Sequence, residues 1–123
     1  MAKGGAKLWY FPDGYLPEKK PGGAMESHEA LMVLNTQDKP ASITMDIYFE
    51  ERSKKQTVTF EVAPETVKTL RMDNPDDLGG ISIPFLTQYA LRVSSDIEVV
   101  VQFGRLDATQ ENLAYYGTMG FCE

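Results

Sequence analysis

The chain has 123 residues, of which 42% are hydrophobic and 24% are charged, and its formal net charge is -6 at pH 7. This length suits one domain with a single core, and the composition is ordinary for a soluble globular protein. Because no apolar run is long enough to span a bilayer and the N-terminus lacks a signal-peptide core, we expect a cytoplasmic protein.

The residues that most enzyme and metal sites need are scarce or wrongly spaced. The single cysteine, Cys122, excludes an intrachain disulfide, and with one histidine a zinc site would need ligands from distant segments. Ser27 and His28 are adjacent, so on a strand their side chains would point to opposite faces. No phosphate-binding glycine motif is present, and no carboxylate pair is singled out by its spacing. We therefore predict no cofactor, no metal and no enzymatic activity.

The first part of the chain is predicted to be a flexible N-terminus followed by an aromatic strand. Residues 1–6 are mostly alanine and glycine around Lys3, so we place the start of the domain, which spans residues 7–123, after them. Residues 7–11 form the first predicted strand, and residues 12–14, Pro-Asp-Gly, are a turn signature. Residues 18–23 have no periodicity and are predicted to be an exposed loop.

The stretch from Glu26 to Thr36 passes from a polar cluster into an apolar strand. Residues 30–34 are apolar at both alternating positions, which is typical of a strand covered on both faces, inside a domain or at a subunit contact. The polar head at residues 26–29 would then lie at the mouth of the strand, where a rigid scaffold presents binding groups. His28 is either a structural residue or part of such a site.

Alternation is clearest in the middle of the chain. Within residues 41–50, one face of the predicted strand carries Ile43, Met45, Ile47 and Phe49. Residues 57–62 alternate again after a charged turn and predict a hairpin with that strand. Residues 66–72 form the next predicted strand, and residues 81–85, interrupted by proline, are at best an edge strand.

The last part of the chain completes an all-β pattern. Residues 89–95 and 97–103 are predicted strands separated by a turn at Asp96, and residues 113–119 form the last strand. Because helical periods are absent, we predict a single-domain antiparallel β-sandwich, jelly-roll-like, of about eight short strands. Residues 30–34 and 97–103 offer more apolar surface than one small core needs, which favours a symmetric homo-oligomer.

Polar residues also follow two other predicted strands. Arg71 precedes Asp73, and Arg105 precedes Asp107; in each pair a spacing of two puts both side chains on one face. These pairs either form ordinary surface ion pairs or converge on a pocket for a small polar ligand. Arginine would donate hydrogen bonds, carboxylates would accept them, and the Trp9 indole would either cover a sugar-like ring or belong to the core. The candidate ligand-binding residues are Trp9, His28, Glu29, Arg71, Asp73, Arg105 and Asp107.

Five segments carry a resemblance to a known family: residues 9–17, residues 26–35, residues 48–52, Ile83-Pro84 and residues 100–107. In their order and spacing they resemble the sensory rhodopsin transducer family, and the resemblance runs from about residue 7 to residue 121. It implies a small soluble β-sandwich that forms a homotetramer and passes a signal from a membrane photoreceptor to cytoplasmic targets.

The same resemblance implies small-molecule binding in wider relatives, with sugars among the ligands suggested. It carries the ligand-site assignment onto Trp9, His28, Glu29, Arg71 and Arg105.

We therefore predict a non-enzymatic signalling or small-molecule-binding domain, with a membrane sensory rhodopsin as a possible partner. A hydrolase is a further class, which would need a carboxylate pair or a nucleophile deep in a pocket. The main alternative is a transcriptional regulator that binds DNA directly through Lys19-Lys20 and Lys54-Lys55, brought together in a tetramer. Because 18 acidic residues outnumber 12 basic ones, we expect no DNA binding at physiological salt.

Overall fold

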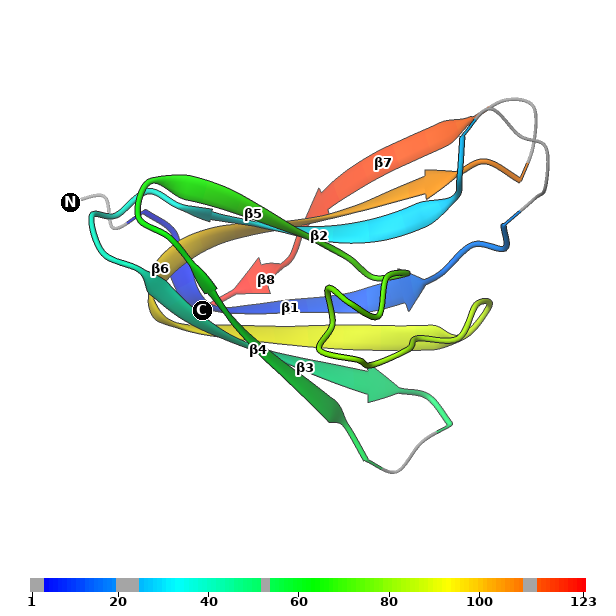
Figure 1. Ribbon diagram of the computed structural model, residues 1–123, viewed down its shortest axis with the longest axis horizontal. Helices are drawn as coiled ribbons and strands as arrows, with labels where there is room; N and C mark the ends of the chain where they lie inside the picture. The colour runs from blue at the N-terminus through cyan, green and yellow to red at the C-terminus, as the bar shows by residue number, and fades with distance from the viewer. Residues whose placement is uncertain (1–3, 20–24, 52–53, 110–112) are drawn as a thin grey trace.

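The computed structural model describes residues 4–19, 25–51, 54–109 and 113–123, and none of these residues is helical. Eight strands form two layers packed face to face (Figure 1), which confirms the predicted all-β antiparallel sandwich. The strands are β1 (Ala6–Tyr15), β2 (His28–Asn35), β3 (Ala41–Phe49), β4 (Gln56–Val62), β5 (Thr66–Arg71), β6 (Gln88–Asp107), β7 (Ala114–Met119) and β8 (Phe121–Cys122). No helix in the described part of the chain is long and apolar enough to cross a membrane.

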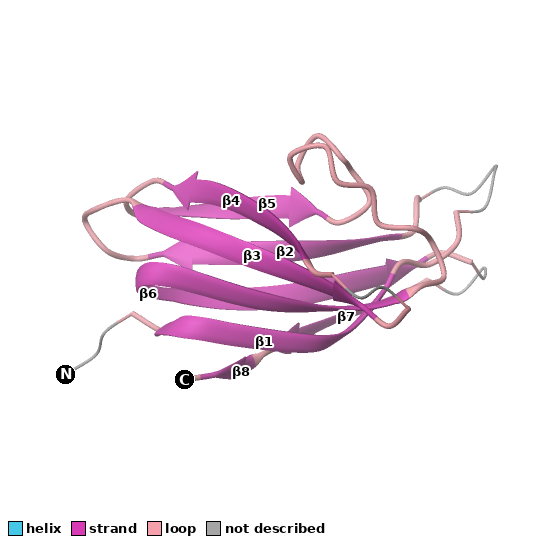
Figure 2. Cartoon of the chain, turned by 90° about the horizontal axis from the view of Figure 1, so that it is seen from below, coloured by secondary structure: helices cyan, strands magenta, loops and turns pink. Residues whose placement is uncertain are grey.

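The long strand β6 belongs to both layers. Its first half pairs with β1 and β3 in the first sheet, whose order is β4-β3-β6-β1-β8. Its second half pairs with β2 and β7 in the second sheet, where β5 pairs with the other edge of β2. The strand bends from one layer into the other (Figures 1 and 2), so both of its ends lie at the same end of the sandwich.

Odd-numbered side chains of β2, β3 and β6 fill much of the core between the sheets, and β4 and β5 add the even-numbered Val58, Val62 and Leu70. Because alternate residues of a strand point to opposite faces, one parity of each long strand faces inward. The following inward residues are at most 2% exposed: Leu31 and Val33 of β2, Ile43, Met45 and Ile47 of β3, and Leu91, Val93, Val99, Val101 and Phe103 of β6. The predicted face of β3 and the β3–β4 hairpin are therefore confirmed.

Two predicted turns lie inside strands instead. At Asp96 the chain does not reverse, because β6 continues through this position and the Asp96 carboxylate, facing solvent, accepts a hydrogen bond from the Ser42 N–H at 2.8 Å. At residues 12–14 β1 continues with a shift of register between Phe11 and Gly14. A side chain at Gly14 would come within 2.4 Å of the Tyr89 ring, so glycine is needed there for close packing.

The remaining differences concern residues 81–85 and the strand 30–34. Residues 81–85 form no strand and belong to the long connection between β5 and β6. In β2 one parity faces the core, whereas Met32 and Leu34 lie on the outer face of the second sheet, where Leu34 is 39% exposed. The second apolar parity is therefore covered only in part within the described part of the chain, because Ala30 is buried and Met32 is half-buried.

Candidate functional site

The predicted site residues gather at one end of the sandwich, which we call the polar end. Here β1 ends, β2 begins, β5 ends and β6 both begins and ends, at the right of Figure 1. All the predicted residues except Trp9 belong to these strand ends, where charged groups form two clusters.

The first cluster surrounds the carboxylate of Glu29, which is 0% exposed. Glu29 has the same parity in β2 as Leu31 and Val33, so the strand directs it into the sandwich. The Tyr89 hydroxyl donates to this carboxylate at 2.5 Å, and Arg105 Nε donates at 2.6 Å. The backbone N–H of Tyr15 lies 3.0 and 3.1 Å from its two oxygens. One carboxylate thus joins β1, β2 and both ends of β6; we call this group the Glu29 clasp.

The charges of the Glu29 clasp are balanced. A buried carboxylate is tolerated when it is paired and hydrogen-bonded. Burial opposes the charge of Arg105, but the hydrogen bond and the charge of Glu29 outweigh burial and raise the pKa of the guanidinium. Burial, with the nearby charge of Glu29, raises the pKa of Tyr89 well above its usual value, so Tyr89 remains a neutral donor. The ring of Tyr116 covers Arg105, with 5.2 Å from the guanidinium carbon to the ring centroid.

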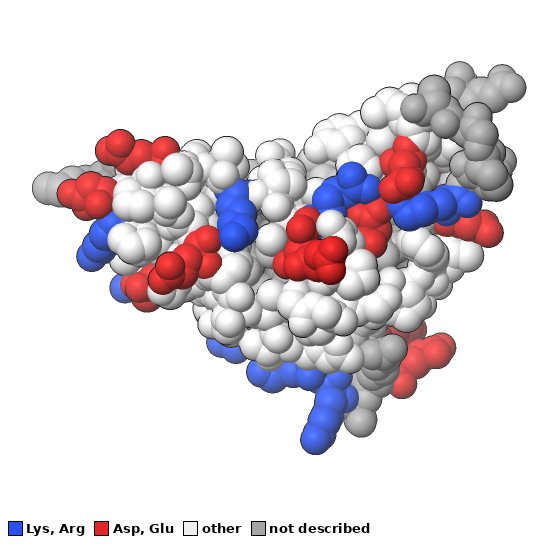
Figure 3. All heavy atoms as spheres, in the orientation of Figure 1, with Lys and Arg blue, Asp and Glu red and all other residues white. Residues whose placement is uncertain are grey.

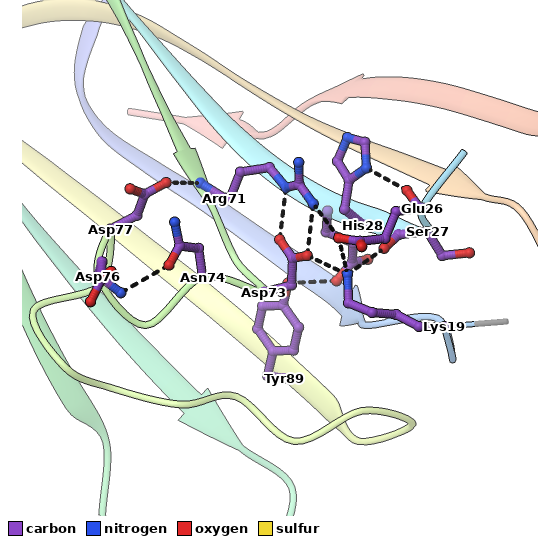
Figure 4. A network of polar contacts seen from close by, with 11 residues as sticks. Lys19, Glu26, Ser27, His28, Arg71, Asp73, Asn74, Asp76, Asp77 and Tyr89 are labelled. Carbon is purple, nitrogen blue, oxygen red and sulfur yellow. Dashed lines mark hydrogen bonds and ion pairs between the residues drawn. The ribbon is translucent and has the colours of Figure 1, made fainter. Parts of the chain in front are cut away.

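The second cluster is centred on Asp73, whose side chain is 4% exposed. Arg71 donates to both carboxylate oxygens at 2.7 Å, and Lys19 Nζ lies 2.7 Å from Oδ2 (Figure 4). Lys19 also contacts the Glu26 carboxylate at 2.6 Å. Burial alone would raise the pKa of Asp73, but the hydrogen bonds from Arg71 and Lys19 dominate and lower it to about 2. We call Lys19, Glu26, Arg71 and Asp73 the Asp73 cluster.

Two polar hollows open at this end. The Asp73 cluster and Asn74 line a pocket of about 350 Å³. A second hollow of about 300 Å³ lies beside Arg105 and Asp107, with Thr109 at its edge. Asp107 accepts hydrogen bonds from the Thr109 hydroxyl at 2.6 Å and the Thr109 N–H at 2.9 Å, and these bonds lower its pKa.

The structure changes how the predicted residues are grouped. Arg71 pairs with Asp73 as the spacing of two suggested, whereas Arg105 turns to Glu29, its direct neighbour across the β2–β6 ladder. The Asp107 carboxylate is held by Thr109 instead.

His28 and Trp9 lie outside the two clusters. His28 Nδ1 is 2.9 Å from the backbone oxygen of Glu26, and His28 lines none of the polar hollows described above. Trp9 is a core residue with 5% exposure, and its indole N–H is directed at the backbone oxygens of Ala6 and Val99, at 3.1 Å from each. The expected indole platform is therefore absent from the polar end.

Sequence reasoning missed three important members of the clusters. Lys19 comes from a stretch without periodicity, so nothing in its surroundings indicated a partner. Tyr89 was predicted only as the first residue of a strand, and no pattern linked its hydroxyl to a carboxylate 60 residues away. Glu26 was noticed only as part of the polar head. The burial of Glu29 could have been predicted from the sequence, because Glu29 has the same parity in its strand as the apolar Leu31 and Val33.

Charges on the surface are mixed. Acidic and basic side chains are interspersed over most of the face shown in Figure 3, and a group of basic ones lies along its lower edge. Of the lysines on which a DNA-binding face would depend, Lys19 is paired with Glu26 and Asp73, and Lys55 lies 3.3 Å from Asp46. Lys20 lies outside the described residues. Within the described part of the chain, no group of three or more His, Cys, Asp or Glu residues could hold a metal ion.

Comparisons with known proteins cover nearly the whole chain. Residues 4–122 match the family described as Anabaena sensory rhodopsin transducer. The crystal structure of Thermotoga maritima 1070 is similar, with a TM-score of 0.84 and 35% identity over 97% of this chain and 96% of that one. The structure of the Anabaena sensory rhodopsin transducer has a TM-score of 0.70 and 25% identity over 84% of this chain and 97% of that one. No curated protein sequence matches the chain significantly.

Proposed function

The chain belongs to the Anabaena sensory rhodopsin transducer family, and we propose that it is a non-enzymatic, cytoplasmic signalling domain that binds a small polar ligand. The observation that carries the ligand proposal is the pocket of about 350 Å³ lined by the Asp73 cluster. Its charged groups are open to solvent, because the Lys19 side chain is 31% exposed and that of Glu26 is 63% exposed.

The chemistry of this pocket suits a hydroxylated ligand. Arg71 supplies donors, Glu26 supplies an acceptor, and the Asn74 amide can do both. Lys19 already donates to Glu26, Asp73 and the Ser27 carbonyl, so it would reach a ligand by exchanging one of these contacts. A sugar-like molecule matches this set, because each of its hydroxyl groups both donates and accepts. The exposed ring of Phe85 contacts Lys19, with its centroid 5.9 Å from Nζ, but it does not line the pocket.

The ligand proposal is tested by a thermal-shift screen of sugars and other small polar metabolites. A ligand that binds only the folded state at 100 times its dissociation constant stabilises it by about 2.7 kcal/mol. Glu26→Gln should reduce the shift, because an amide oxygen is a weaker acceptor than a carboxylate, and it should not lower the unliganded melting temperature, because this side chain is exposed. Lys39→Ala, at an exposed lysine in the turn beyond β2, is a control at a distant surface position and should leave the shift intact. An undiminished shift in Glu26→Gln would contradict a direct contact between Glu26 and the ligand.

We also propose that the chain forms a symmetric homo-oligomer, a tetramer by analogy with the family. The supporting observation is the outer face of the second sheet, where apolar side chains adjoin across neighbouring strands. Leu34 lies opposite Val67, which is 61% exposed, while Met119 and Tyr115 of β7 are 51% and 63% exposed. An exposed apolar face of this kind marks an interaction surface. Light scattering that gives a monomer mass at micromolar concentration would contradict this proposal.

A membrane sensory rhodopsin is the proposed partner, because the family is named for that interaction. Binding can be measured by calorimetry with a detergent-solubilised sensory rhodopsin from the same organism. Absence of saturable binding at concentrations of tens of micromolar would remove the rhodopsin from the proposal, while the ligand screen would still test the pocket separately.

A further inference from the structure

A third hollow, of about 500 Å³, lies at the open edge of the sandwich between β1 and the segment that joins β7 to β8. Here the chain leaves the second sheet at Met119 and reaches the first sheet at Phe121, which pairs with Tyr10 of β1. The hollow shares no lining residue with either polar hollow. Its lining is largely aromatic, with the rings of Tyr10, Phe11, Phe103, Tyr116 and Phe121. It also includes one acidic residue, Asp13.

The base of this hollow is the aromatic core itself. Phe11 and Phe103 come from different sheets, are 3% and 1% exposed, and have ring centroids 6.0 Å apart at an interplanar angle of 36°. Phe121, which is 66% exposed, has its centroid 6.2 Å from that of Tyr10 at an angle of 31°. Rings from both sheets therefore surround a space that opens to solvent, and such surfaces favour a flat aromatic molecule through offset or tilted ring contacts.

The charged groups around this hollow disfavour negatively charged ligands. Its lining includes no lysine or arginine, and its one acidic group, Asp13, has a side chain that is 72% exposed. Arg105 Nη2 is 3.6 Å from Asp13, but its Nε is committed to Glu29 and its plane is covered by Tyr116. A negatively charged ligand would meet the Asp13 carboxylate with no lysine or arginine in the lining of the hollow to pair with, whereas an N–H or O–H group could donate to that carboxylate.

We propose that this hollow is a second binding site, for a small planar aromatic molecule that carries a hydrogen-bond donor and no negative charge. The site is independent of the polar pocket proposed above, because the two have no lining residue in common. Its walls belong to β1 on one side and to the β7–β8 segment on the other. A ligand in this site contacts both walls and therefore holds the C-terminal strands against β1. Ligand binding is thereby linked to β7, the strand of the second sheet that carries the exposed Met119 and Tyr115.

The proposal is tested with indole as the probe and with indole-3-acetate as its anionic counterpart, by two-dimensional NMR titration of the full chain. Indole should give saturable shifts in residues 10–13 and 116–121, and indole-3-acetate should bind several-fold more weakly. Phe121→Ala should weaken indole binding about tenfold. Phe85→Ala removes an exposed ring that does not line the hollow and should leave binding unchanged.

Asp13→Asn tests the charge selectivity separately from the fold. It should improve the affinity for indole-3-acetate about fivefold relative to indole, because the repelling carboxylate is gone. Three results would each overturn the proposal: no saturable shifts with indole, shifts confined to other parts of the chain, or equal binding of the two probes to the unmodified protein. None of these results would affect the polar pocket, whose test uses sugars and Glu26→Gln.

Discussion

The Glu29 clasp makes a strong prediction about stability. In Arg105→Leu the buried carboxylate of Glu29 loses its only paired cation in the described structure, while the Tyr89 hydroxyl and the Tyr15 N–H remain. Removing one partner of a buried ion pair typically costs about 3–5 kcal/mol, because the remaining charge stays buried and uncompensated. We therefore expect the free energy of unfolding to fall by about that amount.

The assay is equilibrium unfolding in urea at pH 7. With an m-value of about 2 kcal/mol/M, a loss of this size moves the unfolding midpoint by roughly 2 M. The matched control is Arg92→Leu, at an exposed arginine whose nearest contact to Asp46 is 3.8 Å. Asp46 is itself buried but keeps Lys55 at 3.3 Å and the Thr57 hydroxyl at 2.7 Å, and the Arg92 side chain is 43% exposed, so the midpoint of the control should hardly move.

A double variant separates the cost of the orphaned charge from the cost of lost packing. Glu29→Leu combined with Arg105→Leu leaves no buried charge, so it should be more stable than Arg105→Leu alone. Recovery will be partial, because the Tyr89 hydroxyl then lacks its acceptor. The reasoning is refuted if Arg105→Leu behaves like Arg92→Leu, or if the double variant is less stable than the single one.

Four other predictions follow from the same structure. The depressed pKa of Asp73 contributes stability above pH 3.8 that is lost as the pH falls towards 2; a full shift is worth about 2.4 kcal/mol and screening reduces it to about 1 kcal/mol. Urea unfolding between pH 2 and 5 should show that loss, and Asp73→Asn should not. Gly14→Ala should destabilise by about 1–3 kcal/mol in thermal melts, because its Cβ meets the Tyr89 ring at 2.4 Å, and an unchanged melt would contradict this. Val67→Lys should reduce the mass measured by light scattering if the outer face of the second sheet is an interface, and an unchanged oligomer would locate the interface elsewhere. DNA should not bind at physiological salt, and a tight complex whose affinity falls steeply with salt would show that a basic face exists.

The alternation of polar and apolar residues predicted the strands well. The polar composition around Asp96, however, suggested a turn where β6 only bends. The polar residues around Asp96 have the composition of a turn, yet the inward parity is the same before and after it, from Leu91 and Val93 to Val99 and Val101. A strand that bends between two sheets keeps its parity because it does not reverse. Composition alone cannot distinguish these cases, since the difference lies in pairing with β1 and β3 on one side and with β2 and β7 on the other.

The candidate site was predictable where partners lie on one strand end and not where they lie on different strands. A spacing of two correctly suggested that Arg71 meets Asp73. The same spacing failed for Arg105, because Glu29 lies directly opposite it in the β2–β6 register and offers a buried carboxylate. Register is a property of the folded sheets, so no count along the sequence could supply it.

Two carboxylates of the same end, Glu29 and Asp73, differ in the exposure of their partners, and this difference is why we assign the proposed ligand site to the Asp73 cluster. The partners of Glu29 are Tyr89, which is 1% exposed, and Arg105, whose side chain is 17% exposed, so this carboxylate fixes the ends of three strands. The partners of Asp73 are 31% and 36% exposed, so they can exchange contacts with a ligand without leaving a strand unpaired. Binding groups need a rigid base to be held in position. The Glu29 clasp supplies that base because Met72, next to Asp73, donates its N–H to the Glu29 carbonyl at 2.9 Å.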